Sequence, residues 1–157
     1  LDNAKGRCRP SLSYWCWKLF WGKGMWIEQI EIYKNENPFI KINAPSDEKE
    51  IKAAEEALGV SFPNELKGLL LELDGDSLLL FSALQIVTRK ALGGLYGGFE
   101  EPLSIGGNGC GDYYAYTITD GITASNEIIR WEHEDNSRVF VASGLAGLIE
   151  KYHADQV

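Results

Sequence analysis

The residues of this 157-residue chain that most suggest nucleophilic chemistry are its three cysteines and two histidines. Cys110 lies in a glycine-rich stretch, and a thiolate nucleophile needs a nearby base. His153 is close to the C-terminus, so His133 is the better partner if the strands carrying both residues are neighbours. An odd number of cysteines at wide spacing indicates neither a disulfide framework nor a zinc site. We therefore expect no catalytic residues, and a reducing cytoplasm is the simplest setting.

The stretch Gly106-Gly107-Asn108-Gly109-Cys110-Gly111-Asp112 has the composition of a phosphate-binding loop. Such loops bind phosphate when they run into a helix N-terminus, where free N–H groups face the anion. Here a β-rich segment follows, the P-loop lysine is absent and the spacing G-x-G-x-x-G does not occur. The pattern favours a structural hairpin, in which Asp112 hydrogen-bonds the loop backbone and positive φ is supplied by Gly106, Gly107, Gly109 and Gly111.

A second cluster, Trp131-Glu132-His133-Glu134-Asp135, combines one histidine with three carboxylates, which could bind a divalent metal weakly. Side chains alternate along a strand, so Glu132 and Glu134 share one face and His133 takes the other. These side chains therefore do not converge easily on a single metal ion. We expect a strand end with a packed Trp131 and a solvated acidic loop, with no metal and no cofactor.

Acidic residues dominate the chain after its first 24 residues. Residues 1–24 hold five of the 15 Lys/Arg and one of the 23 Asp/Glu, so residues 25–157 hold 10 and 22, a net charge of −12. Such a domain repels nucleic acid and anionic lipid and attracts basic partners, although plain solubility is the simpler explanation. Carboxylates at expected loops and element ends, which could form a docking face, are Asp74, Asp76, Glu100, Glu101, Glu132, Glu134 and Asp135. Their spacing singles out no general acid and base.

Residues 1–24 differ from the remainder, because they combine several tryptophans with basic residues. Lys18 interrupts the apolar run and no small-residue cleavage site follows, which argues against a signal peptide. An interfacial membrane segment is an alternative. We expect an extraneous or disordered extension before Met25, followed by a single domain over residues 25–157. No run approaches the ~18 apolar residues of a membrane-spanning helix.

Apolar periodicity predicts helices from Met25 to Tyr33, from Glu48 to Leu58 and from Pro63 to Leu73. Asp47 and Glu50 can form a capping box before the second, and Gly59 can end it. The run Leu78 to Phe81 is short enough for a buried strand, whereas Ser82 to Leu92 fits neither period.

The period then changes to that of strands, predicted over 103–105, 113–118, 128–131 and 138–141, and a last helix carries Leu145, Leu148 and Ile149. Short connections require antiparallel neighbours. The expected class is α+β, with a mainly antiparallel sheet covered by N-terminal helices and a closing C-terminal helix.

The order of these segments is familiar, and four stretches carry the likeness. They are Glu55-Glu56-Ala57-Leu58-Gly59 with Phe62-Pro63-Asn64-Glu65-Leu66; Leu69 into Asp74-Gly75; Leu103 through the glycine-rich loop to Tyr114; and Ile129 to Glu134 with Val141-Ala142-Ser143 and a final helix. From about Ser46 to Tyr152 the chain resembles the SUKH superfamily, the Smi/Knr-type proteins. Many relatives have Asn-Gly-Gly where this chain has Asp74-Gly75-Asp76.

The resemblance implies a non-enzymatic function, since the family has no established catalytic residues. Many bacterial members resemble immunity proteins that bind and neutralise a polymorphic toxin, often a nuclease, and fungal members resemble regulators that act through protein contacts. The implied partner is a cognate toxin, expected to be basic because carboxylates can mimic phosphates in a basic cleft. An intracellular regulatory or scaffold domain is the alternative.

Overall fold

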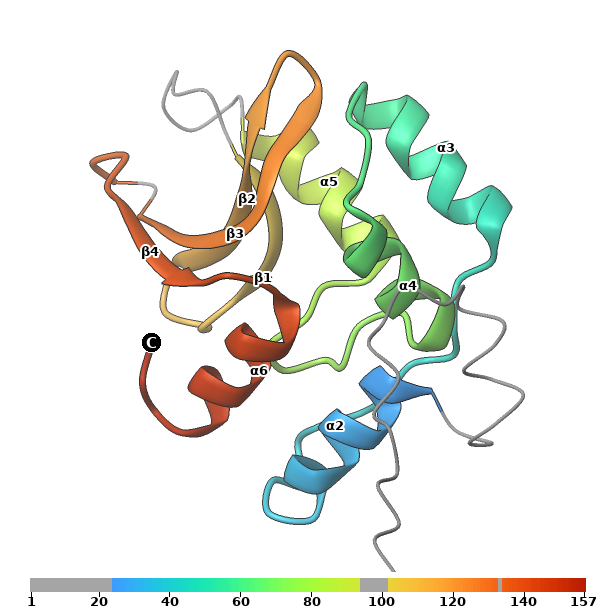
Figure 1. Cartoon of the computed structure of the whole chain (residues 1–157), viewed down its shortest axis with the longest axis vertical. Helices are drawn as coiled ribbons and strands as arrows, with labels where there is room; N and C mark the ends of the chain where they lie inside the picture. Colours follow the sequence, from blue (N-terminus) through green and yellow to red (C-terminus); the bar gives the residue numbers. More distant parts are fainter. Residues whose placement is uncertain (1–23, 94–101, 133) are drawn as a thin grey trace, which may run out of the picture.

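The computed structural model describes residues 24–93, 102–132 and 134–157 (Figure 1). The expected extension thus lies outside the described residues, except for Gly24. Within them, helices precede a sheet and one helix follows it: α2 (Met25–Lys34), α3 (Glu48–Leu58), α4 (Asn64–Glu72), α5 (Ala83–Gly93), β1 (Leu103–Gly107), β2 (Asp112–Thr119), β3 (Ile122–Glu132), β4 (Arg138–Ala142) and α6 (Leu145–His153).

The four described strands form an antiparallel sheet in the order β1-β2-β3-β4, so each strand pairs with its neighbour in the chain. Helix α5 packs against β1, while α6 packs against β3 and β4 and also touches α2 (Figure 1). The α+β class predicted from the sequence is confirmed. At one end of the sheet, Asp120 and Gly121 form the β2–β3 turn, both with positive φ.

Local hydrogen bonds explain where the helices begin. Asp47 accepts from the Glu50 N–H at 2.8 Å and Glu50 accepts from the Asp47 N–H at 2.9 Å, which is the predicted capping box. A second box, which was not predicted, starts α5: Ser82 donates its backbone N–H to the Gln85 side chain at 2.8 Å, and Gln85 donates its backbone N–H to the Ser82 hydroxyl at 3.2 Å. The ambiguous stretch after Ser82 is therefore helical.

The start of α2 is held by a distant residue. The Oε2 atom of Glu72, at the end of α4, accepts hydrogen bonds from the backbone N–H groups of Trp26 at 2.8 Å and Ile27 at 3.3 Å. A carboxylate at a helix N-terminus satisfies orphan donors and interacts favourably with the macrodipole. This contact, together with the buried Trp26 and Ile30, fixes α2 on the domain.

The segment from Leu78 to Phe81 was predicted as a strand, and this is wrong. Only Leu80 forms a β-bridge, to Gly106, although Gly107 donates to the Leu79 carbonyl and Phe81 donates to the Ile105 carbonyl. The amides of residues 78–80 instead donate to the side chain of Asp76. The segment covers the outer edge of β1 without becoming a ladder strand.

A partly buried polar link joins the helices to the sheet. Glu65 on α4 accepts from the Tyr116 hydroxyl at 2.7 Å and, through its other oxygen, from the Leu145 N–H at 3.3 Å, at the start of α6. Burial raises the pKa of Glu65, while these two hydrogen bonds oppose the shift. Around this link the core is apolar, built from residues of all the described helices and of the sheet.

Across residues 24–93, 102–132 and 134–157, no helix has the length and apolar character needed to cross a membrane.

Candidate protein-binding surface

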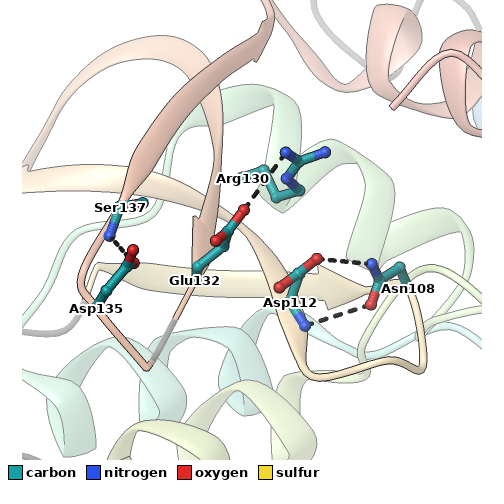
Figure 2. A network of polar contacts seen from close by, with 6 residues as sticks. All are labelled: Asn108, Asp112, Arg130, Glu132, Asp135 and Ser137. Carbon is teal, nitrogen blue, oxygen red and sulfur yellow. Dashed lines mark hydrogen bonds and ion pairs between the residues drawn. The ribbon is translucent and has the colours of Figure 1, made fainter.

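Carboxylates gather at one end of the sheet, where β2 begins, β3 ends and β4 begins. Asp112 on β2 is the direct cross-strand partner of Glu132 on β3, and Glu134 and Asp135 follow in the β3–β4 turn. Figure 2 shows Asp135, Glu132 and Asp112 in succession across this end. We call these four residues the acidic end.

Each carboxylate drawn in Figure 2 has a local partner. Arg130 Nη2 lies 3.4 Å from Glu132 Oε1, and the Asn108 side chain donates to Asp112 at 3.0 Å (Figure 2). Hydrogen bonds from the side chain and the N–H of Ser137 lower the pKa of Asp135. The turn carboxylates Glu134 and Asp135 are exposed.

The loop between β1 and β2 is organised by Asn108. Its Oδ1 accepts from the Cys110 N–H at 2.8 Å and from the Asp112 N–H at 3.3 Å. The predicted hydrogen bond between the Asp112 side chain and the loop backbone is wrong, because that carboxylate accepts from the Asn108 side-chain amide instead. An asparagine side chain both accepts and donates, so it can bond the backbone and the aspartate together.

The four loop glycines fall into two groups. Gly109 and Gly111 have positive φ of 75° and 104°, as predicted. Gly106 and Gly107 do not, because they lie inside β1. A Cβ on Gly106 would collide with the Leu79 carbonyl oxygen, so this glycine permits the close approach of the 78–81 segment.

The β3–β4 turn is held by the packed tryptophan that the sequence predicts. Trp131 is buried and its ring lies 6.3 Å from that of Tyr113. Its indole Nε1 donates to Asn136 Oδ1 at 2.9 Å, and Asn136 has a φ of 64°, a conformation that asparagine tolerates. The Trp131 bond therefore anchors Asn136 to the end of β3, close in the chain to the exposed Glu134 and Asp135.

Beside the acidic end, β4 forms an edge of the described sheet. Its side chains Val139 and Phe140 are 46% and 58% exposed. Exposed edge strands present unpaired backbone N–H and C=O groups, which proteins usually protect. We call Val139 and Phe140 the β4 edge. Neither residue was singled out from the sequence, although an apolar pair directly after a polar turn was a usable signal.

Two predicted docking residues have structural positions instead. Asp76 is fully buried, and its Oδ1 accepts from the N–H groups of Leu78, Leu79 and Leu80 at 3.0, 2.8 and 2.8 Å. Predicting Asp76 as a surface contact was therefore wrong. Asp74 is half-buried, and it accepts from the Ala83 N–H at 2.7 Å, at the start of α5. The number of acidic residues in the sequence does not show which of them are buried acceptors and which are exposed on the surface.

The remaining predicted residues divide as follows. Glu100, Glu101 and His133 lie outside the described residues. Cys110 is an exposed free thiol. Among the residues that the structure describes, no group of three His, Cys, Asp or Glu side chains is arranged to hold a metal ion.

Comparison with known proteins places this architecture in a family. Residues 45–151 match the SMI1 / KNR4 family (SUKH-1), which spans α3 to α6, including the acidic end and the β4 edge. A search of curated proteins found no match. The matched region covers more than half of the chain and has the element order on which the resemblance rested. The chain therefore belongs to the SMI1 / KNR4 family (SUKH-1).

Proposed function

We propose that this domain is a non-enzymatic immunity protein, which binds and neutralises a basic toxin domain such as a nuclease. The observation that carries the proposal is the apolar side chain of Phe140, 58% exposed on the edge strand β4, beside the exposed carboxylates of the β3–β4 turn. Protein interfaces combine an apolar, often aromatic centre with a polar rim, and the most important contacts cluster near that centre. Family membership supports a protein partner.

Phe140 and the acidic turn would contribute differently to binding. An exposed aromatic side chain on an edge strand can fill a partner's pocket while the backbone of β4 pairs with an added strand. The turn carboxylates Glu134 and Asp135, helped by the net −12 of residues 25–157, would attract a basic partner. A field of this sign raises association rates by roughly 10–10³-fold over an uncharged pair.

The glycine-rich loop supports a non-enzymatic function through its hydrogen bonds. Phosphate loops offer free N–H groups to the anion. Here the Cys110 and Asp112 N–H groups donate to Asn108, the Asn108 N–H donates to the Asp112 carbonyl, and the Gly107 N–H donates to Leu79. Because these donors are already paired, the loop is better suited to holding the sheet end than to binding phosphate.

The experiment is co-expression with a toxin domain encoded beside this gene, followed by stopped-flow association at 20–500 mM salt. Phe140→Ser should weaken binding about tenfold or more, mostly by faster dissociation. Glu134→Lys should slow association modestly, and the difference should shrink at high salt. Cys110→Ser should leave neutralisation intact.

Two matched variants serve as controls. Ile122 is exposed at the β2–β3 turn, the opposite end of the sheet, so Ile122→Ser should leave binding unchanged. Glu127→Lys makes the same charge change as Glu134→Lys at an exposed position within β3. The proposal is supported if the wild-type chain rescues cells from the toxin, and if the variants at Phe140 and Glu134 bind more weakly or more slowly while the two control variants bind as the wild type does. No rescue, or tight binding with a flat salt dependence, favours the regulatory or scaffold function.

A further inference from the structure

A cavity of about 420 Å³ lies between the C-terminal ends of α2 and α6, near the glycine-rich loop. The two helices lie side by side (Figure 1). The cavity is separate from the acidic end and the β4 edge, since none of those residues lines it. Its wall combines four aromatic rings, Tyr33, Tyr114, Tyr152 and His153, with the carboxylates of Glu36 and Asp155. Among the described residues, no lysine or arginine lines it.

The aromatic rings form a connected cluster. Tyr33 stacks on His153 with centroids 4.1 Å apart and an interplanar angle of 13°. Tyr152 meets His153 edge-on at 5.3 Å and meets Tyr114 edge-on at 6.2 Å. These contacts fix the rings in place, so the cavity presents preorganised aromatic surface. Aromatic faces are electron-rich and attract cations.

The charges around the cavity are also favourable for a cation. Burial lowers the pKa of His153 against the opposing effects of Asp76 and Glu36, which keeps the imidazole neutral at neutral pH. Burial raises the pKa of Tyr114 to about 12, so its phenol stays uncharged. The acidic side chains at the cavity rim are those of Glu36 and Asp155, which give this site a negative potential.

A buried carboxylate adds to this negative potential. Asp76 uses Oδ1 for three backbone donors, whereas its Oδ2 is buried and has no hydrogen-bond partner among the described residues. Its charge acts on the cavity wall, because Asp76 is one of the groups that raise the pKa of Tyr152 after burial itself. His153 Nε2 is likewise buried without a hydrogen-bond partner in the described part of the chain.

We propose that this cavity is a cation site that accepts the basic side chain, arginine or lysine, of a bound partner. The inference rests on the proposed function for the identity of the partner, but the site itself stands on the aromatic wall and the carboxylate rim. A basic side chain would place its charged group between Glu36 and Asp155 and its alkyl stem along the rings. The acidic end and this cavity would then be two separate recognition elements.

The site can be tested without the toxin. Acetyl-arginine methylamide, acetyl-lysine methylamide and the neutral acetyl-citrulline methylamide are titrated to 50 mM into the full chain. The NMR signals of the His153 imidazole and the tyrosine rings are followed at low salt. The cationic probes should give saturable shifts at His153, and the citrulline probe should bind at least roughly fivefold more weakly, since it lacks the charge.

Three variants locate the site. Glu36→Gln and Asp155→Asn each remove one rim charge, and each should weaken the arginine probe by roughly two- to fivefold at low salt. Asn is compatible with the positive φ of 53° at position 155. Glu28→Gln is the matched control, because Glu28 is exposed in the first turn of the same helix as Tyr33 and does not line the cavity. It should bind the probe as the wild type does.

Equal shifts with the arginine and citrulline probes, or no saturable shift at 50 mM, would overturn the cation site. Probe binding unaffected by both rim variants would do the same. Probe binding without toxin neutralisation would keep the site and remove the proposed function. Neutralisation without probe binding would keep the function and remove the site.

Discussion

The fully buried Asp76 gives the most discriminating test of the fold. Its single oxygen Oδ1 collects three N–H groups, and the residues carrying two of them, Leu79 and Leu80, are themselves buried. Asp76→Ala would leave these donors without an acceptor. An unsatisfied buried donor costs about 1–3 kcal/mol, so two such donors should cost about 2–6 kcal/mol of the free energy of unfolding. This is a large part of the ~5–15 kcal/mol that stabilises a typical domain.

Asp76→Asn separates the acceptor from the charge. Asparagine keeps an oxygen at the position of Oδ1, so the three bonds can persist as neutral hydrogen bonds. Bonds to charged groups are stronger than neutral ones by roughly 1 kcal/mol, and we expect a loss of about 1–2 kcal/mol. The predicted order of stability is wild type, then Asp76→Asn, then Asp76→Ala.

Urea unfolding followed by circular dichroism measures these differences. Glu134→Ala is the control, because this exposed turn carboxylate should change stability by less than about 0.5 kcal/mol. If Asp76→Ala matched the Glu134 variant, the three-donor argument would be refuted. If Asn were as destabilising as Ala, the charge and not the acceptor geometry would be the stabilising feature.

Three further predictions test other parts of the structure. Folding favours the protonated form of Glu65, because burial raises the pKa of its carboxyl group. The stability that this protonation contributes is fully present below the usual pKa of 4.5 and is lost as the pH rises through the raised pKa. We therefore expect the urea midpoint of Glu65→Gln to rise relative to that of the wild type between pH 4 and pH 7. A difference between the two midpoints that stays constant with pH would contradict this. Gly75→Ala should cost about 1–2 kcal/mol more than Gly109→Ala, because both have positive φ but only at Gly75 would a Cβ meet backbone atoms, at 2.7 Å from the Leu80 oxygen. Equal losses of stability for the two variants in thermal unfolding would show that the positive φ, and not the backbone contact, sets the cost of the substitution. Removing residues 1–23 should leave Tm within a few degrees of that of the full chain. A loss of ~1 kcal/mol lowers the Tm of a small domain by ~4–8 °C, so a larger fall would show that the tryptophans of residues 1–23 pack on the domain.

The regular elements of this fold could be predicted because their signals are local. The capping box at Asp47, the left-handed Gly59 and the Asp120-Gly121 turn each depend on a few consecutive residues. The box at Ser82 and Gln85 was equally local but was missed, because the apolar positions that follow fit no clear period.

Features that depend on distant partners could not be predicted. Glu72 at the start of α2 and Glu65 at the start of α6 act 45 and 80 residues away in the chain. The 78–81 segment has strand composition, but three of its four amides, those of residues 78–80, bond to Asp76, which no strand pattern reveals. The sequence grouped Glu132, Glu134 and Asp135 as an acidic cluster, but it did not bring Asp112 beside them and did not identify the β4 edge or the aromatic cavity.

The acidic residues of this domain therefore act in two different ways, which the sequence alone does not distinguish. Glu55, Glu72, Asp74 and Asp76 accept backbone N–H groups and so stabilise helix starts and turns inside the domain. Glu65 also accepts a backbone N–H group, although its burial favours the protonated form. Glu134 and Asp135 are exposed beside an apolar edge, where a partner can reach them. All of these charges contribute to the long-range field that speeds encounter, but only the exposed ones can form contacts. Charge reversal inside should thus act on folding, and charge reversal at the acidic turn should act on association.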